Sequence, residues 1–300
     1  MSAHPPRRLA LTVTPEQAGR KIDTLMRTGL GLSGTVIRRV KWLSDGILLD
    51  GVRVHTDVRP RAGQVLSVLV ADGVRRSGIV PAAGALDIVY EDADILVLNK
   101  APGVPVHPGP GHFSDTIGNF LLDYYDKEGI QADFHPVHRL DKGTSGLLMV
   151  AKHPHAQEAL KNALHTPDFR RFYLAVCEGV PQPPAGIIDA PIGPVPGSLI
   201  ARRVAADGQP SRTRYETLRT AHGRALLRLE LETGRTHQIR VHMAHLGHPL
   251  TGDFLYGTED PALISRPALH SAQLRLLHPV TGKPMTFTLP LPADMARLVE

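Results

Sequence analysis

The chain has 300 residues, of which 42% are hydrophobic and 21% charged, so it can bury one large core and a smaller one. Its 34 Lys and Arg residues against 29 Asp and Glu give a net charge of +5. The single cysteine, Cys177, excludes an internal disulfide bond and a zinc site built from thiolates. No run approaches the roughly 20 apolar residues that cross a bilayer, and the N-terminal residues lack the apolar core of a signal peptide. We therefore expect a cytoplasmic protein without membrane contact.

Basic residues are concentrated in the first part of the chain. Residues 1–80 contain 13 Lys and Arg against 6 Asp and Glu, a net of +7, whereas the other 220 residues contain 21 against 23, a net of −2. Such a basic region is typical of proteins that bind a polyanion, most commonly nucleic acid. A solvated basic surface without a partner explains the charge equally well.

Two helices are predicted near the N-terminus. Thr14 can cap a helix, Pro15 suits its first position, and Gln17 can complete a capping box, which predicts a helix through about Arg27. A second helix should begin near Ser33. Its apolar side is formed by Val36, Ile37, Val40 and Leu43, and its basic side by Arg38, Arg39 and Lys41.

Short strands follow these helices. Asp50-Gly51 lies between two β-rich runs and is a strong hairpin signal, and residues 65–70 indicate a further strand. Together these elements predict a small α/β domain over residues 12–72. Residues 73–86 are rich in Gly, Ala, Arg and Pro and lack periodicity, which is typical of an interdomain linker.

Strands dominate the pattern of residues 87–297. Apolar runs on either side of residues 91–94 predict a hairpin, and residues 153–164 predict an amphipathic helix. Further strands are expected at 146–152, at 172–180 with Cys177 buried, and as an antiparallel pair at 211–220 and 225–233. Helices interrupt the strands irregularly, which favours an α+β fold over a regular βαβ arrangement.

Asp141 is followed by Lys-Gly-Thr-Ser-Gly, a composition that predicts a turn leading into a strand. By itself, an aspartate in such a turn is more often structural than catalytic. Thr144 and Ser145 fit the turn, and neither has a triad partner at a recognisable spacing, which disfavours a serine hydrolase.

Residues 231–257 are rich in arginine and histidine. His242, His245 and His248 are spaced by three and could bring one helical face to a metal ion. No HExxH pattern accompanies them, however, and Gly247 and Pro249 should end a helix. We therefore expect no metal site, and interpret the histidines as RNA contacts or hydrogen-bonded polar residues.

Five blocks in order carry a family resemblance. HRLDKGTSGLLMVAK (138–152) strongly resembles the signature of the RluA family of RNA pseudouridine synthases, and TGRTHQIRVHMAHLGHPLTGDFLYG (233–257) resembles its other long signature. NKAPGVPVHPG (99–109), FYLAV (172–176) and LHSAQLRLLHP (269–279) match further blocks. One departure is Ala101, where the family commonly has proline. The resemblance covers about residues 86–290.

This resemblance implies a mixed, mainly antiparallel sheet with flanking helices around a central cleft. It implies a reaction that detaches uracil from its ribose, turns the base, and rejoins it through carbon. Because nothing is oxidised, added or removed, no cofactor is implied. By the matching motif, Asp141 is the catalytic aspartate, either as a nucleophile or as a proton acceptor near the sugar.

The resemblance also assigns roles to four other residues. Arg240 matches the arginine that pairs with the aspartate, and Ile239 should pack against the base. Tyr173 matches the aromatic residue that stacks beside the target uracil. Arg139 resembles the arginine that enters the RNA stack when the target nucleotide flips out. Without the resemblance, Tyr173 and Ile239 would be assigned to ordinary core packing.

The N-terminal part resembles a small RNA-binding domain first named from a ribosomal small-subunit protein. The resemblance rests on the helix-helix-hairpin order, the basic second helix and residues 61–68. It implies that Arg38, Arg39 and Lys41 contact RNA, although these residues could simply solvate a helix face.

We therefore expect a monomeric isomerase that acts on structured RNA and not on DNA. Large-subunit ribosomal RNA is the commonest substrate of members with this extra domain, and transfer RNA is the alternative. Two other function classes are a catalytically silent RNA-binding ribosome assembly factor and a zinc hydrolase. Intact Asp141, Tyr173 and Arg240 favour the enzyme over the silent factor.

Overall fold

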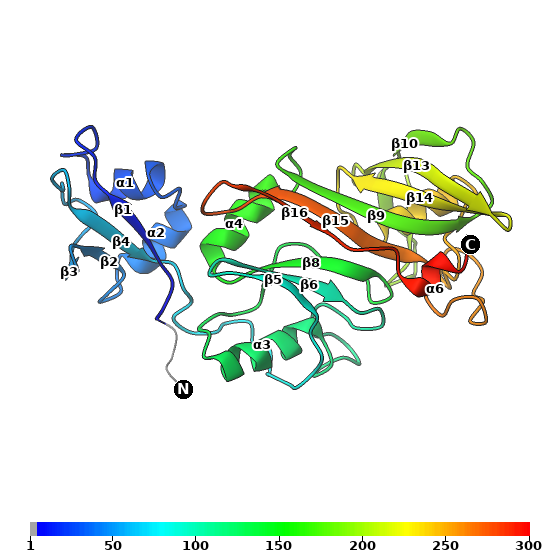
Figure 1. Ribbon diagram of the computed structural model, residues 1–300, viewed down its shortest axis with the longest axis horizontal. Helices are drawn as coiled ribbons and strands as arrows, with labels where there is room; N and C mark the ends of the chain where they lie inside the picture. The colour runs from blue at the N-terminus through cyan, green and yellow to red at the C-terminus, as the bar shows by residue number, and fades with distance from the viewer. Residues whose placement is uncertain (1–4) are drawn as a thin grey trace.

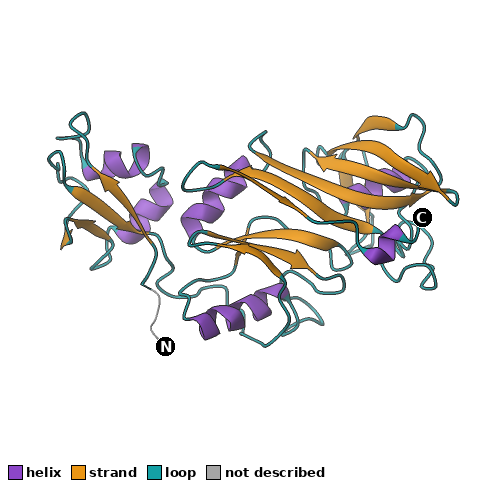
Figure 2. Cartoon of the chain, viewed as in Figure 1, coloured by secondary structure: helices purple, strands orange, loops and turns teal. Residues whose placement is uncertain are grey.

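The computed structural model describes residues 5–300 and contains sheets of four, ten and two strands (Figure 1). The four-stranded sheet lies at one end of the molecule with the first two helices. The ten-stranded sheet forms the body, and the remaining helices lie around it (Figure 2). This mixed arrangement of many strands and few helices confirms the predicted α+β fold.

The N-terminal part is built on a small antiparallel sheet with strand order β1-β4-β2-β3. Apolar side chains of its two helices pack with those of β4 in a core of their own. The elements are β1 (Arg8–Thr12), α1 (Ile22–Thr28), α2 (Gly34–Val40), β2 (Ile47–Leu49), β3 (Val52–Arg53) and β4 (Val65–Leu69).

Local sequence signals explain two of these elements. The Ser33 side chain accepts a hydrogen bond from the Val36 N–H and so caps α2, as predicted. Asp50 and Gly51 have φ values of 49° and 82°, the left-handed pair that a two-residue hairpin turn requires. The hairpin of β2 and β3 is therefore confirmed.

The first helix begins at Ile22, so the prediction of a start at Pro15 was wrong. The Gln17 side chain does accept from the Thr14 N–H at 3.1 Å, but this bond closes only a turn. Gly19 follows with φ of +75°, and its N–H donates to the Pro60 carbonyl at 2.9 Å. A left-handed residue paired outside the segment stops helix growth there.

The large sheet has strand order β10-β13-β14-β9-β15-β8-β6-β5, with β16 on β15 and β7 on β8. Its pairs are antiparallel except for β15 with β8, which is the mixed, mainly antiparallel sheet that the family resemblance implies. Its strands are β5 (Ile88–Glu91), β6 (Ile95–Lys100), β7 (His135–Pro136), β8 (Ser145–Ala151), β9 (Phe169–Glu178), β10 (Ala185–Asp189), β13 (Arg212–Ala221), β14 (Arg224–Leu231), β15 (Leu269–Leu277) and β16 (Pro284–Thr288).

The middle of this sheet is buried on both faces. Alternate residues of β8 enter two different cores: Leu148 and Val150 pack with helix α3, whereas Leu147 and Met149 pack with helix α4. Burial on both faces explains the uninterrupted apolar run that the sequence shows here. The remaining elements are α3 (Ile117–Glu128), α4 (Pro154–Ala163), β11 (Ile192–Pro194), β12 (Arg202–Val204), α5 (Gln238–His245) and α6 (Ala293–Ala296).

Helix α3 was not predicted from the sequence. It is capped by a box in which Thr116 and Asn119 exchange side-chain hydrogen bonds, and Gly129 ends it with φ of 68°. Its cap uses asparagine where the recognisable box has glutamate or glutamine, so the usual signal was missing. No helix within residues 5–300 is long and apolar enough to cross a membrane.

Ionic and polar contacts join the N-terminal part to the body. Arg7 donates to Asp94 at 2.7 and 2.9 Å, and Ser33 donates to Glu158 at 2.6 Å. Within the predicted linker, the N–H groups of Arg76 and Ser77 donate to buried Asp133 at 2.7 and 2.8 Å. The expected linker is thus held against the body, while the domain limits of 12–72, 73–86 and 87–297 stay a prediction.

Candidate active site

Asp141 lies in the turn between β7 and β8, where the sequence predicts a turn. The Thr144 N–H donates to the Asp141 carbonyl at 3.0 Å, and the Lys142 carbonyl accepts from the Gly103 N–H at 2.8 Å. These backbone bonds hold the turn, while the Asp141 side chain keeps 28% of its surface exposed. The carboxylate is therefore fixed in place and still accessible.

A buried lysine supports this turn. Lys100 is 1% exposed, and its Nζ donates to the carbonyls of Ala101 and Val104 at 2.9 Å and of Lys142 at 3.1 Å. Three acceptors match the three donors of an ammonium group. Burial lowers the pKa of Lys100 to about 7, and the nearby Asp141 carboxylate opposes that shift. Lys100 thus ties two loops together beneath Asp141.

Arg240, from the first turn of α5, lies beside Asp141, with its Nη1 3.7 Å from the Asp141 Oδ2. Its shorter bonds go to Asp253, where Nε and Nη2 each lie 2.7 Å from a carboxylate oxygen. The Arg240 and Asp253 side chains are 4% and 0% exposed. Because Asp253 binds Nε and Nη2, only Nη1 is directed toward Asp141. Asp253 is therefore the main partner of Arg240, and Asp141 is a weaker second one.

Asp253 is itself held by backbone donors. It accepts from the N–H groups of Leu255 and Tyr256 at 3.0 and 3.2 Å. The rings of Phe254 and Tyr256 lie 5.5 and 5.1 Å from the Arg240 guanidinium. Burial disfavours the charged form of Arg240, but the hydrogen bonds and charge of Asp253 outweigh it, so the pKa of Arg240 is raised.

His237 is a second basic side chain near Asp141. It begins α5 from a left-handed conformation with φ of 58°, and its Nδ1 lies 2.8 Å from the Tyr256 hydroxyl. Its Nε2 is 4.0 Å from the Asp141 Oδ2. Burial lowers the pKa of His237 although Asp141 opposes that shift. Because the His237 imidazole is therefore neutral near neutral pH, Arg240 is the permanent positive charge beside Asp141.

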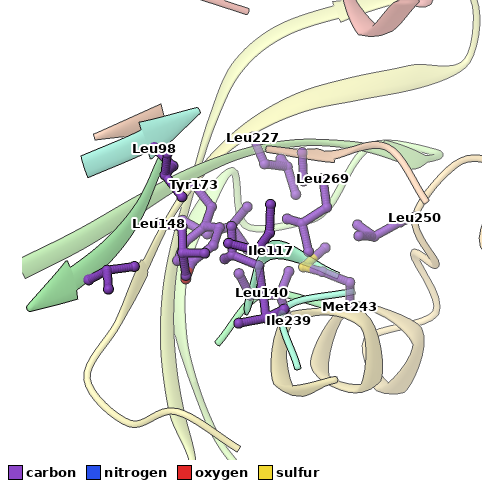
Figure 3. Packing of buried hydrophobic residues seen from close by; sticks show 14 of the residues in the cluster. Leu98, Ile117, Leu140, Leu148, Tyr173, Leu227, Ile239, Met243, Leu250 and Leu269 are labelled. Carbon is purple, nitrogen blue, oxygen red and sulfur yellow. The ribbon is translucent and has the colours of Figure 1, made fainter. Parts of the chain in front are cut away.

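Tyr173 and Ile239 are both 4% exposed and belong to the main core, together with Leu140 (Figure 3). Tyr173 comes from β9 and Ile239 from α5. Burial raises the pKa of Tyr173, so its phenol is neutral at physiological pH. Core packing, the alternative role weighed for both residues, is therefore part of what they do.

A cavity of about 390 Å³ opens at this place. Asp141, Tyr173 and Arg139 line it, whereas Arg240 and Ile239 are not among its lining residues. Arg139 is exposed, in contrast to its neighbours His138 and Leu140. The structure thus brings three of the five proposed active-site residues to one cavity and places Arg240 behind the carboxylate.

The three histidines spaced by three do not converge. His242 is buried, with its ring nitrogens 2.8 Å from the Thr213 Oγ1 and 2.9 Å from the Ala190 carbonyl. His245 is exposed at the end of α5, and the His248 Nδ1 lies 2.9 Å from the Glu178 carbonyl. His242 and His248 are thus polar residues with partners of their own, and His245 is a surface residue.

The three basic residues of the second helix differ from one another. Arg38 is exposed, and Lys41 lies over the Trp42 ring at 4.9 Å. Arg39 instead donates to the Val70 carbonyl at 3.0 Å and lies 3.6 Å from Asp72. The Arg39 guanidinium is therefore partly occupied by contacts within the protein.

Lys100 and Asp253 were not identified from the sequence, although both lie within the quoted signatures. A single lysine at the end of a strand or aspartate in a loop carries no signal of burial. Only their tertiary contacts show that one supports the Asp141 turn and the other orients Arg240.

Comparisons with known proteins agree with this architecture. The sequence model of a family described as RNA pseudouridylate synthase matches residues 94–245. The RNA pseudouridine synthase YjbO of Bacillus subtilis is 40% identical over 271 residues, covering 90% of this chain and 95% of that protein. The ribosomal large subunit pseudouridine synthase D of Escherichia coli O157:H7 is 38% identical over 307 residues, covering 97% and 93%.

A solved structure of a protein with a related name is also similar to this chain. Human RNA pseudouridylate synthase domain containing 1 is 28% identical, with a TM-score of 0.58 over 70% of this chain and 87% of that one. The chain belongs to the RNA pseudouridylate synthase family, which confirms the resemblance of its signatures. It is an isomerase, an RNA pseudouridine synthase, and the zinc hydrolase hypothesis is set aside.

We predict that Asp253→Asn destabilises the protein and slows turnover. The substitution leaves the buried Arg240 cation without its bidentate partner, which costs about 3–5 kcal/mol for a buried pair. The freed guanidinium can then rotate away from its present position beside Asp141. Urea unfolding should give a lower midpoint, and single-turnover conversion of RNA should be slower.

Glu259→Gln is a suitable control, because it removes an exposed carboxylate six positions further along the same loop region. It should change neither quantity. An Asp253→Asn protein with an unchanged urea midpoint would show that this pair does not hold the site together.

Proposed function

We propose that this synthase modifies large-subunit ribosomal RNA and that Asp141 is its essential carboxylate. One observation carries the role of Asp141: it is a partly exposed carboxylate in the wall of a cavity, 3.7 Å from a buried arginine. Relatives named ribosomal large subunit pseudouridine synthase D, 37% and 38% identical over 97% of this chain, support the substrate. A ribosomal substrate also fits a cytoplasmic, monomeric enzyme.

The reaction breaks the bond between N1 of uracil and C1′ of the ribose, and forms a bond from C5 of uracil to the same carbon. A proton leaves C5, and N1 gains one. Asp141 can attack C1′ as a nucleophile or accept a proton near the sugar, and either role requires its anion. Arg240 places an opposite charge 3.7 Å from the carboxylate and so favours one orientation of it.

Tyr173 and Arg139 are proposed to handle the target nucleotide. Tyr173 presents a neutral aromatic ring to the cavity, suited to stacking on the uracil, with Ile239 packed nearby. Arg139 is exposed at the cavity and carries a rigid cation. It is suited to fill the gap left in the RNA stack, which offsets part of the few kcal/mol that flipping costs.

The N-terminal domain, residues 12–72 followed by a linker at 73–86, is proposed to bind RNA and to leave the chemistry to residues 87–297. Its net charge and its own core support this division. Arg38 and Lys41 are the best placed for phosphate contacts, because Arg39 is engaged with Val70 and Asp72. Arg39 can contribute with the exposed part of its side chain.

We predict that Asp141→Asn abolishes pseudouridine formation but preserves folding and RNA binding. Asn keeps the size and most hydrogen bonding of Asp, so the turn should survive. It cannot act as an anion, so the chemistry should not. The measurement is single-turnover conversion of labelled RNA at saturating enzyme, and appreciable conversion by a verified variant contradicts the proposal.

Arg139→Ala is the matched comparison. It should bind RNA but turn over slowly, because the flipped state is less populated. An RNA whose target uridine is already unpaired should partly rescue Arg139→Ala and should leave Asp141→Asn inactive.

The substrate proposal predicts that a strain lacking this gene loses pseudouridine at specific positions of its large-subunit ribosomal RNA. Pseudouridine mapping of total RNA from that strain is the test, with re-expression of the active protein restoring the same positions and the Asp141→Asn protein failing to do so. If pseudouridine is lost only from transfer RNA, the proposed ribosomal substrate is wrong, whereas the assigned enzyme class is still correct.

The N-terminal proposal predicts that Arg38→Gln combined with Lys41→Gln weakens RNA binding and its salt dependence. Each lost phosphate contact lowers the log–log salt slope by about 0.7–0.9, so the pair should lower it by about 1.4–1.8. Arg219→Gln, an exposed arginine on β13 in the body, is the control for general charge loss. An unchanged slope for the double variant means that this helix does not bind RNA.

A further inference from the structure

A buried arginine lies in the wall of the cavity that contains Asp141. Arg171, on β9, is 3% exposed, and its Nη2 donates to the Thr233 carbonyl at 3.2 Å. Its Nε has no hydrogen-bond partner among residues 5–300. Burial lowers the pKa of Arg171, and the influence that opposes this shift comes from the Tyr173 phenol rather than from a carboxylate. It is a buried cation with spare donors.

The neighbouring histidine shows the same incomplete bonding. His138 is 6% exposed, and its Nε2 accepts from the Met149 N–H at 3.2 Å. In a neutral imidazole the other nitrogen, Nδ1, must then carry the proton. Within the described part of the chain, this Nδ1 has no partner in good hydrogen-bond geometry, and the Arg139 backbone beside it is the one influence that favours the protonated ring. Burial, with help from the Arg171 charge, lowers the pKa of His138 to about 3, so the ring stays neutral.

Both residues line one cavity, although the unpartnered Nε and Nδ1 atoms themselves are buried in its wall. Arg171, His138, Asp141 and Tyr173 all line it. Arg171 and Tyr173 are two residues apart on β9, so their side chains share a face and are separated by about 6.6 Å along the strand. Arg171 therefore lies one step beyond the ring that is proposed to stack on uracil. A buried cation without a carboxylate partner is costly, and an anionic ligand that reaches Arg171 from the cavity removes part of this cost.

Charge identifies the kind of acceptor. Besides Arg171, the cations that line this cavity are Arg139, Lys161 and Arg235, and the one carboxylate among its lining residues is Asp141. A guanidinium fork matches the oxygens of a phosphate, and hydrogen bonds between charged groups are stronger than those to a neutral uracil carbonyl. The surplus of cations thus favours an anionic group.

We propose that Arg171 is the centre of a phosphate subsite that binds a phosphodiester flanking the target uridine, with the neutral His138 ring packed beside it. This inference rests on the proposed function, because the nucleotide must enter this cavity. Binding there holds the flipped nucleotide by its backbone, independently of the contact between its base and Tyr173. It makes Arg171 a positioning residue for a substrate whose ribose faces Asp141.

Uridine 3′,5′-bisphosphate and uridine are the probes, and their binding to the full-length protein is measured by calorimetry. The wild-type protein should bind the bisphosphate about tenfold or more tightly than uridine, as expected for charge-assisted hydrogen bonds. Arg171→Met should reduce this preference several-fold, to the residual level that Arg139, Lys161 and Arg235 maintain, and Arg171→Lys should leave an intermediate value. Equal binding of both probes by the wild-type protein overturns the proposal.

Two further variants test the geometry. Gly234→Ala keeps the Arg171 charge, but the new Cβ would lie 3.0 Å from the Arg171 Nη1 and should lower the preference for the bisphosphate. Arg170→Met removes a cation from the same strand that pairs with Glu230 at the surface, and should leave the preference unchanged. If Arg171→Met weakens uridine and bisphosphate by the same factor, Arg171 contacts the base or sugar and the proposal is wrong.

The melting temperature of the Arg171→Met protein distinguishes phosphate binding by Arg171 from a purely structural role. Removing a buried cation that lacks a carboxylate partner should leave the melting temperature of the free protein unchanged or raised, whereas loss of a structural arginine lowers it. A clear decrease for Arg171→Met overturns the proposal. Asp141→Asn should keep the wild-type preference for the bisphosphate, so the subsite and the role of Asp141 can fail separately.

Discussion

The buried ion pair between Arg240 and Asp253 is the interaction on which the site depends. Two charges removed from water are stable together only if their geometry is good and their remaining hydrogen bonds are satisfied. Asp253 meets this condition with two Arg240 nitrogens at 2.7 Å and two backbone N–H groups. Because the fork of the guanidinium is fully used by Asp253, the position of the third nitrogen beside Asp141 is determined by the pair.

The other side of Asp141 is fixed by the large sheet. Its turn leads directly into β8, a strand buried on both faces, and Lys100 at the end of β6 bonds to the carbonyl next to Asp141. The Asp141 carboxylate is thus attached to β8 and β6, and the Arg240 cation to α5. Ile239 of α5 and Leu140, which precedes Asp141 in the turn, pack in the same core, and this packing sets the distance between Asp141 and Arg240 (Figure 3).

Sequence patterns predicted those parts whose cause is local. The Ser33 cap, the Asp50-Gly51 hairpin and the apolar run of β8 all follow from neighbouring residues. The predicted start of the first helix was wrong because the Gly19 N–H bonds to Pro60, a contact that no pattern within the helix reveals. The residues of the candidate site likewise include some that were predicted and some that were not. A signature located Asp141 and Arg240, but Asp253 and Lys100 acquire their roles only through burial and partners elsewhere in the fold.

Hydrogen-bond saturation distinguishes support from function in this cavity. Lys100 has three acceptors for three donors, and Asp253 has four donors, as groups that hold the structure should have. Asp141 instead has its nearest basic nitrogens at 3.7 and 4.0 Å, and the donors of Arg171 and His138 are incompletely used. The groups behind the cavity are thus satisfied, whereas Asp141 and Arg171 in its wall keep a charge that no close partner within the described residues neutralises, at a cost in stability that a substrate can offset. In the proposed complex, the Asp141 carboxylate faces the sugar and the buried Arg171 cation binds its phosphate.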